Sequence, residues 1–399
     1  MKKIGLIQRL IIAIILGIII GLLKFEILTR ILVTFNGIFN NFLSFAIPLI
    51  ILGFVASGIT ALGKNLGKIL FVAVLLAYLS TIIAGLIAYF TNGSILPILL
   101  KSQHLSIASQ VNPEESLLVP YFKIDMPPVM QVMTALLLSF IIGMGAVIAR
   151  AKFLKGIIDD FQIIVDKLVA KVLVPLLPIH ICGIIANMTH VGQIWHLLQV
   201  FIKVFIVIIL LHILYLLIQY TIVGIVTKRN PLRLLKTMLP AYVTALGTQS
   251  SAATIPVTLS RAKVNGISEG IRNFAIPLFA NIHLAGSAIT ITGCAIAIAY
   301  LTGMQLNISV FLPFIMMLGI TMVAAPGVPG GAIMSALGLL QTMLGFNDTA
   351  ISLMIALYIT QDSFGTACNV TGDAAIAMLV DNIHEKNPSV ARNEAFKQA

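Results

Sequence analysis

The segment QDSFGTACNVTGD, residues 361–373, places polar side chains inside a long apolar stretch near the C-terminus. Counted from Asp362, Thr366 follows after 4 residues, Asn369 after 7 and Asp373 after 11. A helix repeats about every 3.6 residues, so these four side chains are predicted to form one stripe along a helix. A carboxylate at membrane depth costs roughly 2.5–3.5 kcal/mol on insertion scales, and such groups usually line an ion or substrate path. We therefore interpret the stripe as functional.

The composition of the whole chain is that of a membrane protein. Of its 399 residues, 59% are hydrophobic and only 10% are charged. Apolar runs recur along the whole length, which predicts a single polytopic α-helical membrane domain. The net charge of +11 also fits nucleic-acid-binding proteins, but the basic residues fall at the ends of apolar runs, where the positive-inside bias puts them. Nucleic acid is therefore not an expected partner. The sequence contains no catalytic motif such as His-Glu-x-x-His, so we expect neither an enzyme nor an enzyme cofactor.

The apolar runs predict the membrane spans. In the first part of the chain, helices are expected at residues 7–23, 34–62, 68–92, 129–151, 156–188 and 194–227. The more polar segment 93–128 is expected to be an external loop. Basic residues cluster at alternate connections, which predicts eight spans with both termini in the cytoplasm. The short loops suggest the plasma membrane of a prokaryote.

Two later segments are broken by residues that disfavour helices. Segment 231–262 contains GTQSSAAT at 247–254 followed by Pro256, and segment 310–343 contains PGVPGG at 326–331. Proline removes a backbone donor and glycine weakens a helix, so neither segment is expected to stay helical through its middle. Broken backbone at membrane depth persists only where it is buried in protein or lines a water-filled cavity. We therefore predict two re-entrant hairpins, hairpin 1 (231–262) and hairpin 2 (310–343).

Each hairpin is followed by an apolar helix with a polar interruption. The helix at 269–303 is interrupted by NIHLAGS at 281–287. The helix at 348–381 carries the polar stripe and ends at Asp381, a carboxylate expected to reach the membrane surface. The order of a hairpin followed by a broken helix occurs twice, and this pattern is typical of transporters with a site at the membrane midplane. Helix ends at the hairpin tips would offer free backbone N–H groups to an anion.

The tips and the last helix resemble those of the dicarboxylate/amino acid:cation symporter family, which includes the glutamate transporters. The resemblance lies in TQSSAATIPVT (248–258), GVPGGAIM (327–334) and NVTGD (369–373). It implies an all-α fold of eight transmembrane helices plus two re-entrant helical hairpins, a homotrimer, and an elevator mechanism in which a transport domain moves against a fixed scaffold. It also implies a scaffold-rich part in residues 1–230, with helices 3 and 6 in the transport domain, a transport core in residues 231–383 and a cytoplasmic tail in residues 384–399.

The resemblance implies roles for single residues. Asp362 matches the carboxylate that binds the substrate's α-amine, and Asn369 and Ser251 match groups that hold its α-carboxylate. Electrostatics agree, because an anionic Asp362 attracts an ammonium group and repels a substrate that carries only carboxylates. The substrate-binding residues expected on this basis are Gln249, Ser250, Ser251, Ser287, Val328, Gly330, Gly331, Asp362, Gly365, Thr366 and Asn369.

Gly365 indicates a substrate without a second carboxylate. Family members that carry acidic substrates have an arginine there, or at the position of Gln249, and often an aspartate at the position of Tyr358. Without that cation, a second carboxylate would be buried unpaired, at a cost of roughly several kcal/mol. We therefore expect a small neutral amino acid such as serine, threonine or alanine. The alternatives are a sodium- or proton-coupled symporter of glutamate, aspartate or C4-dicarboxylates, and a channel, since re-entrant hairpins also build pores.

The resemblance also implies a sodium site. The expected ligands are the side chains of Asn369 and Asp373 and the backbone carbonyls of Phe279 and His283, since hard oxygen ligands suit a small cation. Sodium is the expected coupling ion, and the proton is the alternative.

A second family sodium site is altered in this sequence. His283 and Ala285 replace its Asn and Asp, which leaves Tyr78 and Thr81 as weak candidate ligands. His283 is expected either to form hydrogen bonds as a neutral side chain in place of the lost ion, or to act as a proton carrier.

Overall fold

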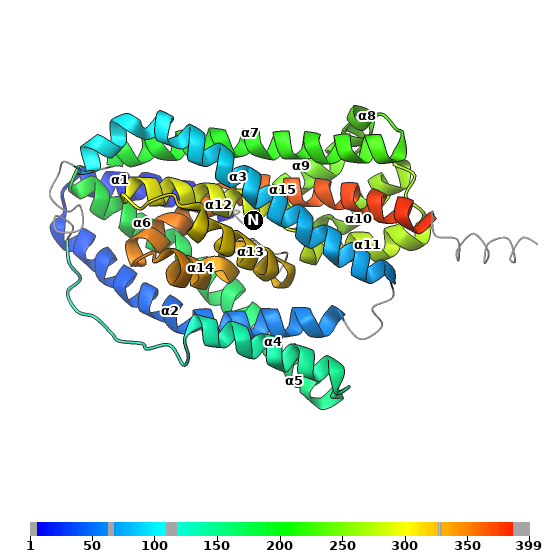
Figure 1. Cartoon of the computed structure of the whole chain (residues 1–399). Coiled ribbons are helices and arrows are strands. Elements are labelled where there is room, and N and C mark those ends of the chain that lie inside the picture. Colours follow the sequence, from blue (N-terminus) through cyan, green and yellow to red (C-terminus); the bar gives the residue numbers. More distant parts are fainter. Residues whose placement is uncertain are drawn as a thin grey trace, which may run out of the picture.

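The computed structural model describes residues 6–62, 68–108, 118–192, 194–325, 327 and 329–385, and every regular element in this part of the chain is a helix. Figure 1 shows the helices side by side, most of them along the long axis of the molecule. The predicted all-α class is thus confirmed. Val328 and the tail residues 386–399 lie outside the described residues.

The N-terminal half consists of long apolar helices close to those predicted. They are α1 (Leu6–Leu22), α2 (Glu26–Leu62), α3 (Lys68–Ala108), α4 (Val132–Ile148), α5 (Lys152–Leu168), the π-helical segment η1 (Val169–Leu173), α6 (Val174–His190) and α7 (Ile194–Thr227). α3 corrects the sequence-based expectation, because residues 93–108 continue the helix instead of joining an external loop. The reason is hydrophobic: the apolar window of α3 runs from Ile69 to Leu100, past the polar Asn92.

The helix predicted at 156–188 is bent in its middle. Residues Lys152–Leu173 meet Pro175–His190 at an angle of 43°. Pro175 has no N–H to donate to the carbonyl four residues earlier, and its ring crowds that carbonyl, so the preceding turn widens into the π-helical segment η1. Beyond the bend, α6 packs against α1 and α2.

The C-terminal half has shorter helices, and its breaks fall where the sequence predicts them. The helices are α8 (Pro231–Thr237), α9 (Leu239–Thr248), α10 (Ser251–Val264), α11 (Glu269–Ile282), α12 (Ala285–Leu301), α13 (Ile308–Ala324), α14 (Gly331–Leu344) and α15 (Asp348–Glu385). Hairpin 1 is interrupted between α9 and α10 and hairpin 2 between α13 and α14, and in each the two helices pack against each other. The helix predicted at 269–303 is interrupted at His283 and Leu284.

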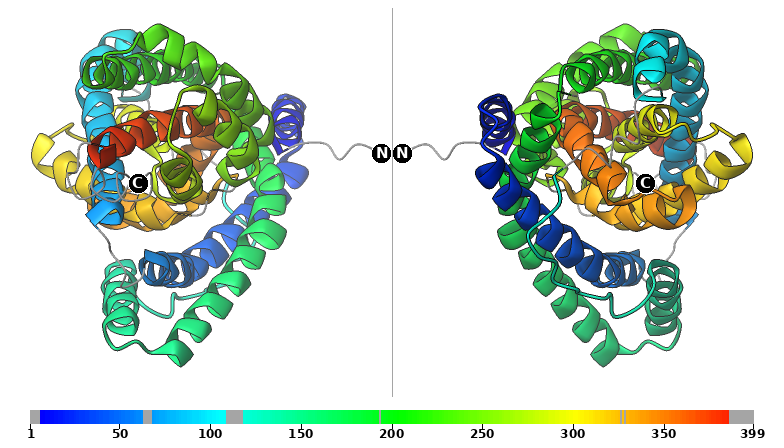
Figure 2. Two further views of the ribbon diagram at one scale, coloured as in Figure 1. Left: turned by 90° about the vertical axis from the view of Figure 1, so that its right-hand side faces the viewer. Right: turned by 90° about the vertical axis from the view of Figure 1, so that its left-hand side faces the viewer.

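α12 and α15 form the centre of the C-terminal half. All residues of α12 from Ala285 to Ala299 are buried, and α15 packs against α3, α7, α9, α10, α11, α12 and α14. Figure 2 shows α15 enclosed by its neighbours, while α2, α4, α5 and α6 extend to one side. The polar stripe of α15 is therefore surrounded by protein, as polar groups at membrane depth require.

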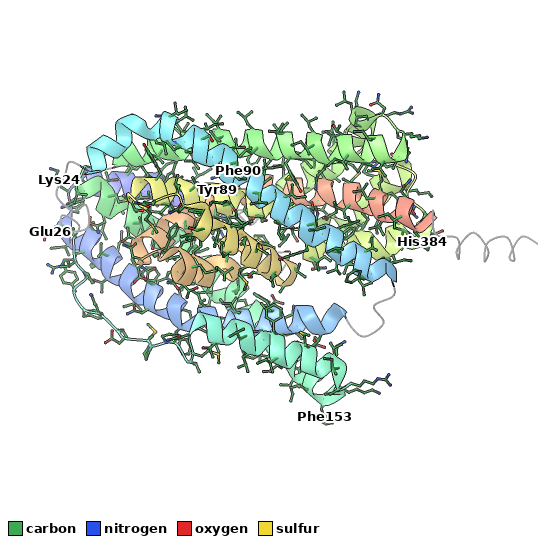
Figure 3. All side chains as sticks on the ribbon, in the orientation of Figure 1. Lys24, Glu26, Tyr89, Phe90, Phe153 and His384 are labelled. Atoms are coloured by element: carbon green, nitrogen blue, oxygen red, sulfur yellow. The ribbon has the colours of Figure 1, made fainter. Side chains whose placement is uncertain are left out.

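The chain is a multi-pass membrane protein. Within the described residues, four helical segments are long and apolar enough to cross a membrane, and the bent pair of α5 and α6 makes a fifth if it is one span. The four are Glu26–Ser57, Ile69–Leu100, Leu198–Thr227 and Glu269–Leu301. Figure 3 shows Lys24 and Glu26 at one end of the molecule and His384 and Phe153 toward the other.

Candidate functional site

The tips of the two hairpins touch each other. Ser250 caps α10 by accepting a hydrogen bond of 3.2 Å from the Ala253 N–H, and its hydroxyl donates to the Gly327 carbonyl oxygen at 3.1 Å. Gly327 also lies close to α11, since a Cβ on it would be only 2.8 Å from the Ala280 carbonyl oxygen. The small residues at the tips allow this close approach of three elements.

Both tips contain a residue in the left-handed backbone region. Gln249 has a φ of +54°, and Gly330, which caps α14, has a φ of +75°. For a residue with a side chain, such as Gln249, this conformation costs roughly 1–2 kcal/mol, and strained backbone of this kind clusters at functional sites. Gly330 adopts it without that cost.

Asp362 lies under the tip of hairpin 2. Its side chain is 4% exposed, and its Oδ2 accepts a hydrogen bond of 2.7 Å from the Gly330 N–H. Its Oδ1 accepts a hydrogen bond of 2.9 Å from the Tyr358 hydroxyl, one helical turn earlier, and Thr366 also hydrogen-bonds to this carboxylate. α15 and the start of α14 thus build the surroundings of Asp362 together, and a helix N-terminus favours negative charge.

Asn369 caps the start of α12. Its Oδ1 accepts hydrogen bonds from the Gly286 N–H at 2.7 Å and the Ser287 N–H at 3.3 Å, and its Nδ2 donates to Ser287 Oγ at 3.0 Å. These are donors that the first turn of a helix leaves unpaired. Ser287 Oγ lies 3.1 Å from the Tyr358 hydroxyl, so a chain of hydrogen bonds runs from Asn369 through Ser287 and Tyr358 to Asp362.

α12 and α15 touch backbone to backbone at two glycines. A Cβ on Gly286 would overlap the Gly365 carbonyl oxygen and lie 2.7 Å from Cys368 Cβ. A Cβ on Gly365 would lie 3.3 Å from Thr290 Oγ1, also on α12. Gly365 therefore faces α12, and the absence of both side chains lets the start of α12 reach Asn369.

Asp373 pairs with His283 at the break between α11 and α12. His283 Nδ1 lies 2.9 Å from Asp373 Oδ1, and the two side chains are 0% and 1% exposed. The other ring nitrogen, Nε2, lies 2.9 Å from Ser80 Oγ on α3. Ser80 Oγ lies 2.7 Å from the Tyr215 hydroxyl and accepts a hydrogen bond of 3.0 Å from Gln219 Nε2, both on α7. A buried polar network thus connects α3, α7, α11 and α15.

The α3 and α7 members of this network are not among the residues predicted from the sequence. His212, Tyr215 and Gln219 are 3 and 4 residues apart in an apolar helix, and this spacing on one helical face is a signal that could have found them. His212 Nε2 lies 3.0 Å from the Gly286 carbonyl oxygen, so the same face of α7 also holds the start of α12.

The other predicted substrate residues lie at the hairpin tips. Ser251 is the first residue of α10 and is buried, and Gly331 is the first residue of α14 and is also buried. Val328 lies outside the described residues. What these residues do for a substrate stays a prediction.

The predicted cation ligands are engaged by donors of the protein itself. Asn369 Oδ1 accepts two N–H groups, Asp373 Oδ1 is paired with the His283 ring, and the Phe279 carbonyl accepts the His283 N–H at 2.9 Å. A sodium ion needs several oxygen lone pairs directed at one point. The His283 ring takes one oxygen of Asp373, and the sodium site stays a prediction.

The two weak candidate ligands make contacts elsewhere. The Tyr78 hydroxyl donates to the Met316 carbonyl oxygen on α13 at 3.4 Å. The Thr81 hydroxyl donates to the Ala77 carbonyl oxygen of its own helix at 2.9 Å. Ser80, between them in sequence, is the residue of this turn that reaches His283.

Comparison with known proteins identifies related transporters. The model of the sodium:dicarboxylate symporter family matches residues 6–383. The serine/threonine transporter SstT of Acinetobacter baumannii (strain AYE) is 26% identical over 395 residues, which are 95% of this chain and 97% of that protein. A putative sodium-dependent excitatory amino acid transporter, glt-6 of Caenorhabditis elegans, is 28% identical over 264 residues, which are 63% of this chain. The chain spans only 47% of the length of the glt-6 protein.

Proposed function

The chain belongs to the sodium:dicarboxylate symporter family, and from this membership we propose that it carries a small neutral amino acid, such as serine, threonine or alanine, across the membrane together with a cation. Membership in a symporter family makes it a transporter and not an enzyme, in agreement with the sequence-based prediction. The name of the serine/threonine transporter, which aligns over nearly its whole length, supports a neutral substrate.

The observation that carries the proposal is the carboxylate of Asp362 under the tip of hairpin 2. A buried anion at that place attracts the α-ammonium group that every amino acid carries. The α-carboxylate would then bind between the amide of Asn369 and the starts of α10 and α14, at Ser251 and Gly331, because helix N-termini favour anions.

The surroundings of Gly365 support a substrate side chain without charge. The groups that a side chain at this position would meet are the Thr290 hydroxyl and the backbone of Gly286, neither of them cationic. Because this position supplies no cation, a second substrate carboxylate bound nearby would stay unpaired in the protein interior, which is costly. Glutamate, aspartate or a C4-dicarboxylate remains the alternative class of substrate, and the excitatory amino acid transporter among the relatives favours it.

Sodium is the coupling ion we propose, on the basis of the family. Because Asn369 and Asp373 are engaged by protein donors, we assign no step to a cation between them. We propose instead that the neutral His283 ring, with one nitrogen on Asp373 and the other on Ser80, fills the place of a cation. The proton-carrier role is the alternative for the same residue.

Replacing His283 by alanine is expected to lower the free energy of unfolding by roughly 1–3 kcal/mol, because Asp373 Oδ1 and Ser80 lose a buried partner. Sodium chloride should restore part of the lost stability, since a cation can then reach the freed carboxylate. Thermal unfolding of the purified protein in detergent, in sodium chloride and in choline chloride, measures both effects. Equal stability in the two salts would contradict the idea that the ring replaces a cation.

For the architecture we propose eight spans and two re-entrant hairpins, with both termini in the cytoplasm of a prokaryotic cell. The basic connections support this orientation. In Figure 1, α8 lies at the end of the molecule where α15 ends, and Phe153, which neighbours Lys152 and Lys155 in the sequence, lies toward the same end in Figure 3. Positive residues gathered at one end mark the cytoplasmic side.

We also propose the homotrimer and the elevator movement. Residues 231–383 would form the transport core with α3 and α7, because α15 and α12 pack on both of these helices. The remainder of residues 1–230 would form the scaffold, whose helices α2, α4, α5 and α6 extend away from the core in Figure 2.

Uptake of labelled serine into proteoliposomes tests the proposed function. Under an inward sodium gradient we expect saturable serine accumulation that neither glutamate nor succinate inhibits. Strong inhibition by these acids would indicate that the substrate is an acidic amino acid or a dicarboxylate. Accumulation driven by a proton gradient alone would show that the coupling ion is the proton and not sodium. Flux without saturation or accumulation would indicate a channel.

A further inference from the structure

Tyr358 contacts two residues of the proposed substrate site, Asp362 and Ser287, although neither the family resemblance nor the stripe assigns it a role in binding. It is 0% exposed and lies one helical turn before Asp362 on α15. A buried phenol needs a hydrogen-bond partner, and the Tyr358 hydroxyl has two: Asp362 Oδ1 at 2.9 Å and Ser287 Oγ at 3.1 Å.

The chemistry of these groups fixes the direction of the hydrogen bonds. A phenol has a single proton, and the carboxylate of Asp362 can only accept, so Tyr358 donates to Asp362. The hydroxyl of Ser287 is then free to donate to the Tyr358 oxygen, while Ser287 itself accepts from Asn369 Nδ2 at 3.0 Å. Both hydroxyl oxygens keep a lone pair for one further donor.

The same arrangement limits the space for a substrate. In the proposed binding mode the amine is held by Asp362 and the carboxylate by Asn369, and Ser287 and Tyr358 join these two residues through hydrogen bonds. A substrate held at both ends in this way would lie along this chain of hydrogen bonds, with its side chain beside Ser287 and Tyr358. Ser287 is small, so the ring of Tyr358 is the bulky group on this side.

On the basis of the proposed function, we propose that Tyr358 is a residue that determines substrate specificity. Its ring sets the upper size of the substrate side chain. Its hydroxyl, together with that of Ser287, accepts a hydrogen bond from a substrate hydroxyl and so favours serine and threonine over alanine.

The first test is the ratio of serine to alanine affinity in Y358F. Both dissociation constants should rise, because Asp362 loses a donor, but that of serine should rise roughly 3- to 10-fold more, the worth of one neutral hydrogen bond. S287A should lower the same ratio, and Y358F/S287A should lower it no further than either single variant. Ligand-induced stabilisation of the purified proteins measures the affinities without requiring transport.

Y358V tests the size limit, and Y89F serves as the matched control. The smaller side chain should let leucine or methionine compete with labelled serine about tenfold better than in the unchanged protein, in the range expected for one or two methylene groups. Tyr89 on α3 is also buried, and its hydroxyl donates to the Leu306 carbonyl oxygen at 3.0 Å, away from the proposed site. Y89F should therefore change neither the serine to alanine affinity ratio nor the competition of leucine or methionine with labelled serine.

The outcomes separate this inference from the proposed function. If the unchanged protein binds and transports serine but Y358F keeps its serine to alanine ratio, Tyr358 is only structural and the inference is wrong. If Y358V does not fold, Y358F alone decides. Failure of the unchanged protein to bind any neutral amino acid would overturn the proposed function first.

Discussion

Replacing Asp362 by asparagine is expected to weaken serine binding on the order of 100-fold and to abolish uptake, with the fold retained. Asparagine keeps the size of the side chain and an oxygen for the Gly330 N–H, which now donates to Oδ2 at 2.7 Å. It removes the charge that attracts the ammonium group, and loss of one partner of a buried charge pair costs roughly 2–5 kcal/mol. Serine-dependent shifts of the unfolding temperature give the affinity, and proteoliposome uptake gives the transport.

Asp381, on the same helix, provides the matched control. Asp381, which the sequence predicts to reach the membrane surface, is 6% exposed. It accepts hydrogen bonds from the Ser268 N–H at 2.9 Å and the Ser268 hydroxyl at 2.5 Å. It thus holds the start of α11, far along α15 from Asp362. D381N should lower the unfolding temperature and leave the serine affinity of the folded protein unchanged. A D362N variant whose serine affinity stays within about threefold of the unchanged protein would refute the ammonium role.

Replacing Gly286 by alanine is expected to abolish uptake and to destabilise the protein by roughly 1–3 kcal/mol or more. The added methyl group would overlap the Gly365 carbonyl oxygen and lie 2.7 Å from Cys368 Cβ. The obstacle is backbone on α15, which cannot rotate aside as a flexible side chain would. α12 must therefore move away from α15, and Asn369 loses the Gly286 N–H that it now accepts at 2.7 Å. Thermal unfolding and uptake of the purified variant measure the two effects.

Gly93 on α3 gives the corresponding control, since a Cβ there would meet no atom within 4 Å. Alanine is the better helix former, by about 1 kcal/mol in water, so G93A should be as stable as the unchanged protein or more stable and should transport normally. Normal uptake by G286A would mean that the contact between α12 and α15 is looser than the structure has it.

The sequence predicts well those features that depend on neighbours along the chain. Helical spacing places Asp362, Asn369 and Asp373 on one face, and the glycines and prolines of the two hairpins mark where helices cannot continue. Both kinds of feature reappear in the structure, in α15 and in the breaks before α10 and α14.

What the sequence cannot supply is the partner that each polar side chain finds on another element. Asn369 and Asp373 share a stripe, yet one caps α12 and the other pairs with His283. The sequence marks Tyr358 only as the replacement of a family aspartate, and it gives no role to Ser80, which lies between Tyr78 and Thr81. Their contacts depend on the packing of α3, α7 and α12 around α15, which spacing along one helix does not encode.

The hydrogen bond between Gly330 and Asp362 would affect how the proposed transport core returns across the membrane without substrate. In the proposed elevator movement, the transport core would release its substrate on one side and return without it. An unpaired carboxylate would slow this return, because an uncompensated charge is costly in a low-dielectric environment. The backbone of hairpin 2 supplies a donor to this carboxylate, because the Gly330 N–H lies 2.7 Å from Asp362 Oδ2. In the proposed mechanism, the contact that holds the tip of hairpin 2 against α15 would therefore also stabilise the carboxylate during this return. In the proposed binding mode, the substrate ammonium group would compete with the Gly330 N–H for the carboxylate, and this competition would lower the affinity and favour release.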